Sequence, residues 1–160
     1  MEVKGELIEL ALWEVPAHEE YRFTPFVYSG AHAFLLCFSV DDPDTLERII
    51  DRWDPEIKHF GAGGVPRFLV ACKKDLRDDI NTIRRLERTG EVPVSAERGK
   101  EVACVIGATY LECSSKTGEG VREVFQTATE SMAAGIEVAK YKEESSFRKG
   151  RHRNGGCVVL

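Results

Sequence analysis

Short apolar segments alternate along this chain with longer segments in which the apolar residues follow helical spacing. The first apolar segment places Ile8, Leu10 and Leu12 two residues apart, which predicts a strand with a buried face. The later segments are almost wholly apolar, as in strands that are covered on both faces. The predicted strands are residues 6–13, 34–40, 68–72 and 110–113.

Helical periodicity fills the intervals between these strands. Asp42 and Pro43 supply an N-cap and a first helical proline, and the helix that they begin ends at Gly61. The other predicted helices are one that begins near Ser95, a long one over residues 121–136, and a short exposed one over residues 78–90.

Strands separated by helices imply a mainly parallel sheet in an α/β layered fold. Ligands bind such folds at the carboxyl ends of the strands. A binding site is therefore expected in the loops that follow Trp13, Cys72 and Cys113.

Composition removes several classes of function. A length of 160 residues suggests one domain, and 42% hydrophobic with 31% charged residues is typical of a folded globular chain. A net charge of −5 argues against a general nucleic-acid binder. The first five residues do not resemble a secretory signal, and the longest apolar run, residues 31–40, is too short to span a bilayer.

The cysteines argue against a zinc or dithiol redox motif, because none of them shows C-x-x-C spacing. An odd number of cysteines within mostly apolar segments suits a reducing compartment. They are Cys37, Cys72, Cys104, Cys113 and Cys157.

Several motifs resemble those of Rho-type small GTPases, and the resemblance covers nearly the whole chain in the right order. Cys72-Lys73-Lys74-Asp75 resembles the guanine-specificity loop, and Glu112-Cys113-Ser114-Ser115-Lys116-Thr117 resembles the second guanine loop. The stretch 78–90 resembles the insert helix of Rho proteins. Further similar segments are residues 10–13, 19–21, 42–46, 53–60 and 121–125.

The resemblance implies a P-loop NTPase-like (Ras-like) three-layer fold around a parallel sheet. It also implies two regions: residues 1–139 would form a partial G domain, and residues 140–160 a basic tail. The first strand, the P-loop and the first helix of the family have no counterpart here. That first strand lies between the counterparts of residues 6–13 and 34–40, so its loss would leave two strand edges unpaired. Three explanations stay open: a fragment or truncated gene model of a longer protein, a sheet that closes up differently, or poor stability. The resemblance of residues 1–5 to the middle of a family hairpin favours the first.

The guanine loops carry most of the candidate site. The resemblance implies that the Asp75 carboxylate accepts two hydrogen bonds from the guanine N1–H and 2-amino groups, a donor pair that adenine lacks. The stem of Lys73 would lie over the base, and the backbone at Ser114, Ser115 and Lys116 would meet the guanine carbonyl. Cys72 stands where the family has Asn, and a thiol is a weaker donor.

The switch region of the family reads Asp-Thr-Ala-Gly-Gln-Glu, and residues 14–18 of this chain read Glu-Val-Pro-Ala-His, so all five of these positions differ. Three of the changes bear directly on the nucleotide. Glu14 stands in place of the Asp that holds Mg²⁺ through water, and Ala17 in place of the Gly that contacts the γ-phosphate. His18 stands in place of the Gln that orients the attacking water, and we do not assign it a catalytic role. Of the 160 residues, none forms the P-loop pattern G-x-x-x-x-G-K-[ST]. GTP or GDP with Mg²⁺ are the cofactors that the resemblance implies, and we expect this chain neither to bind GTP tightly nor to hydrolyse it measurably.

The last four residues, Cys157-Val158-Val159-Leu160, fit a C-a-a-X signal whose final Leu predicts geranylgeranylation of Cys157. One prenyl chain anchors only marginally, and nearby basic residues strengthen binding to anionic lipid. The upstream basic residues are Arg148, Lys149, Arg151 and Arg153.

Two functions of different class follow. The chain is either a Rho-type switch on the cytoplasmic face of a membrane, with impaired GTP binding and hydrolysis, or a prenylated scaffold that works without nucleotide. The resemblance implies exchange factors, GTPase activators, a dissociation inhibitor and effectors as partners in either case. A non-functional gene product is the third possibility.

Overall fold

The fold alternates strands and helices over most of its length. The computed structural model describes residues 1–3, 5–15, 28–61, 63–144 and 155–159. Its strands are β1 (Glu2–Val3), β2 (Glu6–Leu7), β3 (Glu9–Trp13), β4 (Ala33–Ser39), β5 (Arg67–Cys72), β6 (Thr109–Glu112) and β7 (Gly155–Val159). Its helices are α2 (Pro43–Arg48), the π-helical η1 (Ile49–Trp53), α3 (Asp54–Phe60), the 3₁₀ turn η2 (Lys74–Leu76), α4 (Ile80–Glu87), α5 (Ala96–Ile106) and α6 (Val121–Glu144).

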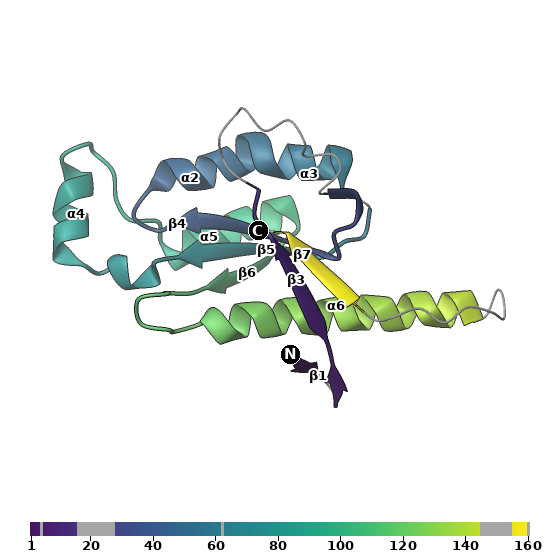
Figure 1. Cartoon of the computed structure of the whole chain (residues 1–160). Helices are drawn as coiled ribbons and strands as arrows, with labels where there is room; N and C mark the ends of the chain where they lie inside the picture. Colours follow the sequence, from purple (N-terminus) through teal and green to yellow (C-terminus); the bar gives the residue numbers. More distant parts are fainter. Residues whose placement is uncertain (4, 16–27, 62, 145–154, 160) are drawn as a thin grey trace.

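The main sheet has five parallel strands in the order β3-β7-β4-β5-β6 (Figure 1). The parallel sheet expected from the sequence is confirmed. The N-terminal residues form a separate antiparallel hairpin of β1 and β2. Gly5 at its turn has a φ of 82°, a conformation that glycine adopts without a steric penalty.

The place expected to be vacant in the sheet holds a strand. Between β3 and β4, where the family has its first strand, the structure places β7 from the C-terminus (Figure 1). Of the three explanations that the sequence left open, a sheet that closes up differently is the one that this topology matches. The division at residues 139 and 140 stays a prediction, although α6 continues to Glu144 and β7 joins the sheet.

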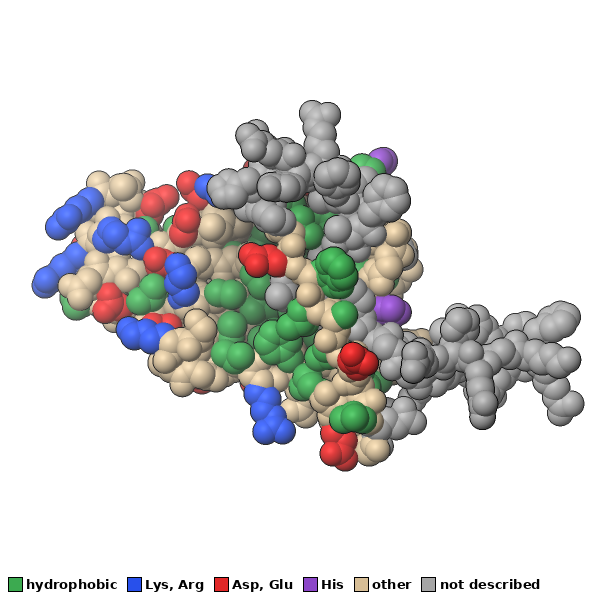
Figure 2. Space-filling model, viewed as in Figure 1, with side chains coloured by type: hydrophobic (Ala, Val, Ile, Leu, Met, Phe, Trp, Pro, Cys, Tyr) green, Lys and Arg blue, Asp and Glu red, His purple; other side chains and the backbone are tan. Residues whose placement is uncertain are grey.

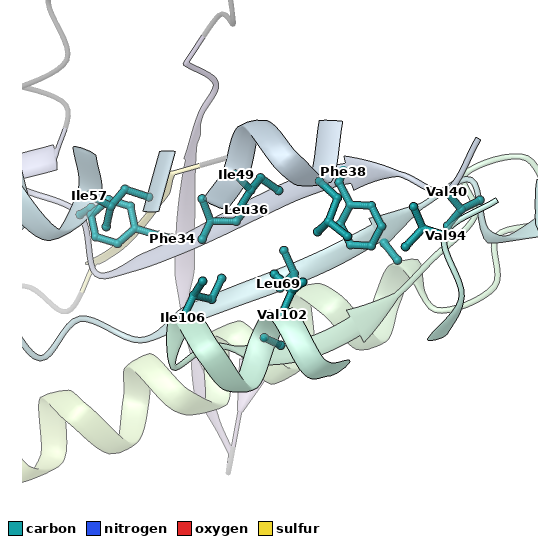
Figure 3. Packing of buried hydrophobic residues seen from close by; sticks show 14 of the residues in the cluster. Phe34, Leu36, Phe38, Val40, Ile49, Ile57, Leu69, Val94, Val102 and Ile106 are labelled. Carbon is teal, nitrogen blue, oxygen red and sulfur yellow. The ribbon is translucent and has the colours of Figure 1, made fainter. Parts of the chain in front are cut away.

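Helices cover both faces of the sheet. The segment α2-η1-α3 and helix α5 pack on one face, where Phe34, Leu36 and Phe38 of β4 meet Ile49 and Val102 (Figure 3). Helix α6 packs on the other face, where Val124, Ala128 and Met132 meet Ala33, Leu35, Phe68 and Val70. The two clusters are the two apolar layers of a three-layer α/β fold.

Local signals account for the helix boundaries. Ser95 caps α5 by accepting a hydrogen bond from the Arg98 N–H at 3.1 Å, and Gly107 ends that helix with a φ of 70°. Asp79 caps α4 in the same way through the Thr82 N–H at 2.8 Å. Asp42 precedes Pro43 as predicted, but its side chain makes no capping hydrogen bond.

Within the described ranges, no helix is both long enough and apolar enough to cross a membrane.

Candidate functional site

The carboxyl ends of β4, β5 and β6 bring three loops together. The Val40 N–H donates to the Cys72 carbonyl at 3.1 Å, and the Lys74 N–H donates to the Cys113 carbonyl at 3.1 Å. The loops that follow Cys72 and Cys113 therefore lie side by side, as the parallel sheet predicted.

Asp75 lies at the centre of this loop cluster. The buried Ser114 hydroxyl donates to Asp75 Oδ1 at 2.5 Å, and Lys116 Nζ lies 3.7 Å from Asp75 Oδ2. The Asp75 side chain keeps 15% of its surface exposed, so its second oxygen can still meet a ligand. The structure thus brings together three of the predicted residues, with Ser115 exposed beside them.

Ser114 also organises the loop around it. Its hydroxyl accepts the Thr117 N–H at 3.2 Å, its N–H donates to the Glu119 carbonyl at 2.9 Å, and its carbonyl accepts the Gly118 N–H at 2.8 Å. Lys74 Nζ lies 2.7 Å from Glu119 Oε1 and ties the two loops together from outside. The Asp75 carboxylate is therefore oriented by a loop that is itself fixed.

Lys73 has an unusual backbone. It is the one non-glycine residue with positive φ, 56°, in the part of the chain that the structure describes. Such conformations cost free energy and concentrate at functional sites. Its ammonium group lies 3.2 Å from Asp41 Oδ1, and Asp41 Oδ2 also holds Arg85 of α4 at 3.0 Å. Figure 2 shows Lys and Arg side chains gathered at the α4 end of the molecule.

Cys72 lies among other thiols. The register pairs Cys37 with Val70 and Ser39 with Cys72, so Cys37 and Cys72 share the face of the sheet that α6 covers. Contact with the Cys37 thiol, together with burial, raises the pKa of Cys72 well above its ordinary value. Burial and the neighbouring Cys72 raise the pKa of Cys113 to about 11. Both are thiols at neutral pH, and the Cys72 thiol donates weakly to the Val70 carbonyl at 3.9 Å.

A partly buried charge pair that was not predicted from the sequence joins the two loops of the site. Arg77 donates to Glu112 at 2.6 and 3.2 Å and to the Val94 carbonyl at 3.0 Å, and the Tyr110 hydroxyl also donates to Glu112. Burial opposes ionisation of Glu112, but hydrogen bonds from Arg77 and Tyr110 hold its pKa below the ordinary value. The sequence held one signal for this pair: Arg77 follows Asp75 by two residues, and Glu112 is an acid at the end of the next strand.

Comparison with known proteins identifies the family to which these loops belong. The Ras family model matches residues 1–134. "GTP-binding protein RHO1" of Candida albicans is 48% identical to this chain, and the alignment covers all of this chain and 75% of that protein. The rho1 protein of Schizosaccharomyces pombe and RHO1 of Saccharomyces cerevisiae are each 43% identical, over 77% and 76% of their lengths. The chain belongs to the Rho family of small GTPases.

The switch residues are the part of a Rho-family site that lies near phosphate and Mg²⁺, and the structure describes only some of them here. Glu14 is exposed just after β3 and lines a cavity of about 370 Å³. Ala17 and His18 lie outside the described residues. Among the residues that the structure describes, no group of three or more His, Cys, Asp or Glu side chains could hold a metal ion.

The predicted membrane signals of this Rho-family chain fall into two parts. Arg148, Lys149, Arg151 and Arg153 lie outside the described residues. The backbone of Cys157 lies in β7, opposite Ala11 of β3. Prenylation and the roles of the guanine-loop residues stay predictions.

Proposed function

We propose that this chain acts in membrane-associated Rho-type signalling as a protein that recognises guanine but binds and hydrolyses GTP poorly. The observation that supports this most is the placement of Asp75. Its carboxylate lies at the carboxyl ends of the strands, held by Ser114 on one oxygen and approached by Lys116 on the other.

Guanine recognition follows from the chemistry of that carboxylate. An ionised carboxylate only accepts hydrogen bonds, and guanine offers two adjacent donors, N1–H and the 2-amino group. Adenine has an acceptor at N1 and would leave the carboxylate unpaired, which costs more than a lost contact. The left-handed backbone at Lys73 is compatible with its stem lying beside the base.

Phosphate binding has less support. The 160 residues contain no G-x-x-x-x-G-K-[ST], the segment that surrounds the phosphates with N–H groups and places a Lys on them. Glu14, Ala17 and His18 replace the Asp, Gly and Gln of the family switch. Because phosphoryl transfer depends on positioning and electrostatic stabilisation, we infer that GTP binding and hydrolysis are both impaired.

We also propose that the protein lies on the cytoplasmic face of the plasma membrane, with a cytosolic pool. Geranylgeranylation of Cys157 would anchor it, and the four basic residues at 148, 149, 151 and 153 would strengthen the anchor. Exchange factors, GTPase activators, a dissociation inhibitor and effectors are its proposed partners.

A nucleotide-independent scaffold is the second candidate. The observation that favours it is the sheet, which holds a strand in the family's first-strand position without any P-loop segment. A protein that keeps its fold without nucleotide could still bind Rho regulators or effectors through its surface.

Nucleotide content separates the two. The 160-residue protein would be purified with Mg²⁺ present and denatured, and the released nucleotide would be separated by chromatography. The proposal expects well under one equivalent of GDP or GTP, with weak guanine binding when nucleotide is added back. Near-stoichiometric nucleotide contradicts both impaired binding and the scaffold, whereas a folded protein with no response to added guanine nucleotide favours the scaffold.

A further inference from the structure

Strands β3 and β4 lie on either side of a position one strand wide, which β7 occupies. We call this position the gap. The strands that border it are far apart in sequence. Strands β3 and β4 are each parallel to β7 and pair with it, not with each other. Without β7, the backbone N–H and C=O groups on that side of β3 and β4 would form two open strand edges inside a sheet. Open edges are costly when buried and prone to aggregation when exposed.

We infer that this gap is an acceptor site for a parallel strand, and that this chain's own segment Gly155–Val159 is its occupant. The pairing is extensive on the β3 side, where all five residues of β7 have a partner, from Glu9 with Gly155 to Trp13 with Val159. On the β4 side, Val158 and Val159 pair with Ala33 and Phe34. Addition of an extended segment to a free sheet edge is an established mode of peptide recognition.

The composition of the segment suits the gap. Gly155 and Gly156 carry no side chain that must fit between the sheet and α6, which β7 also contacts. Val158 and Val159 are β-branched and favour extended backbone. None of the five residues is charged, so the segment brings no ionised side chain into the sheet.

The occupant fills only part of the gap. Its last pair with β4 is Val159 with Phe34, and beyond that point the edge of β4 borders the cavity of about 370 Å³ lined by Leu35, Leu36 and Cys37. On the β3 side, the Leu12 and Trp13 side chains remain 50% and 58% exposed. Because only two residues of β4 pair with β7, little pairing on that side has to break for the segment to leave.

Departure of β7 matters because the same residues carry the lipid signal. Cys157 and the two valines are paired with Ala11, Leu12 and Trp13, so the tail cannot enter a transferase while it is inserted. This consequence rests on the lipidation in the proposed function. Strand insertion and prenylation of Cys157 would then exclude each other, and the gap would control how much protein reaches the membrane.

Cross-linking tests the strand insertion without any assumption about lipid. Ala11 is the Cα partner of Cys157, so Ala11→Cys should form a disulfide with Cys157 when oxidised glutathione accepts the two electrons and two protons of the thiols. Leu12→Cys is the matched control, because it lies one position out of register and on the opposite face of the strand. The yield of the 11–157 disulfide, measured by peptide mass spectrometry, should exceed the yield of the 12–157 disulfide at least about tenfold.

Equal yields from the two variants, or no 11–157 product, would overturn the inserted strand. A product found between two chains, seen as a covalent dimer at low protein concentration, would overturn the choice of this chain's own segment as occupant.

The coupling to lipid is tested by transfer rates. A geranylgeranyltransferase with geranylgeranyl diphosphate would be given the intact chain, the double variant Ala11→Pro/Leu12→Pro, and a synthetic peptide of residues 151–160. Two consecutive prolines remove the N–H that faces β7 whichever residue carries it, and the tail sequence is unchanged. The double variant and the peptide should be modified at least about tenfold faster than the intact chain, because the open state is the minor one.

Two controls keep the outcomes distinct. Gly120→Ala destabilises the fold away from the gap and should leave the rate slow, which separates opening of the gap from general unfolding. Equal rates for the intact chain and the peptide would overturn the coupling. A peptide that is not modified at all would instead refute the proposed lipidation, and the cross-link would still decide the strand insertion.

Discussion

At the scale of single residues, the proposed guanine recognition depends most on the Asp75 carboxylate. Asp75→Ala removes two hydrogen bonds from ligand to a charged group, worth about 1.5–3 kcal/mol each in such settings. Guanosine affinity should therefore fall by about a hundredfold or more, measured by NMR titration. Asp78→Ala is the matched control, because Asp78 is an exposed acid three residues away. Equal losses in both variants would remove Asp75 from the site.

Arg77 and Glu112 give a prediction about pH. Arg77→Ala should lower the free energy of unfolding by about 2 kcal/mol at pH 7, since it leaves a partly buried carboxylate with fewer donors. Because the folded-state pKa of Glu112 lies below its ordinary value of 4.5, the stabilisation is complete above that value. It is lost as the pH falls through the lower, folded-state pKa.

Urea unfolding at pH 7 and at pH 3 measures this difference. The gap between wild type and Arg77→Ala should narrow at the lower pH, whereas Arg84→Ala, an exposed arginine on α4, should stay within about 0.5 kcal/mol of wild type at both. A gap of constant size would mean that Arg77 acts by packing and not by its charge.

At the scale of elements, the loop between β6 and α6 depends on glycine for two separate reasons. Gly118 and Gly120 have φ values of 79° and 73°. A Cβ on Gly120 would lie 2.1 Å from the Glu112 carbonyl oxygen, whereas one on Gly118 meets nothing within 4 Å. Both alanine variants should lose about 1–2 kcal/mol from the left-handed backbone, and Gly120→Ala about 1–3 kcal/mol more from the clash.

Thermal unfolding of the two variants separates strain from overlap. Since Gly120 is also hydrogen-bonded through its carbonyl to the Val124 N–H at 3.0 Å, its variant should shift the start of α6 as well. Equal losses in Gly118→Ala and Gly120→Ala would show that the loop moves to accept the extra atom.

The elements with local signals were predictable from the sequence. Ser95 and Gly107 mark the two ends of α5 by residue type alone, and the apolar runs of β4 and β5 can be placed by composition. The convergence of Asp75 and Ser114 followed from parallel strands whose carboxyl ends share one edge. The Arg77–Glu112 pair was missed because many arginines and acids could pair, and only the register of β5 and β6 selects these two.

β7 was not predictable by those means. Gly-Gly-Cys-Val-Val is too short and has too little periodicity to indicate a strand, and the C-a-a-X pattern predicts a modification of Cys157 and no secondary structure. Its place depends on a gap that exists only after β3 and β4 have assembled. The sequence predicted the position between β3 and β4 from which a strand would be lost, but it did not predict that β7 would occupy it.

At the scale of the whole molecule, the proposed nucleotide site has two parts. Asp75, Ser114 and Lys116 are the proposed guanine side, and a separate cavity is bordered by Glu14 and the edge of β4. In an ordinary nucleotide switch the phosphates supply much of the binding free energy. This arrangement therefore predicts binding that depends on the base and little on the phosphates.

A titration that compares guanosine, GDP, GTP and adenosine in the presence of Mg²⁺ tests this claim most directly. Calorimetry or NMR would give the dissociation constants for the 160-residue protein. We expect the dissociation constants of GDP and GTP to lie within about tenfold of that of guanosine, a difference of about 1.4 kcal/mol. Adenosine should bind more weakly than guanosine. GDP binding more than about a thousandfold tighter than guanosine would contradict base-dominated binding, since the protein would then contain a strong phosphate site.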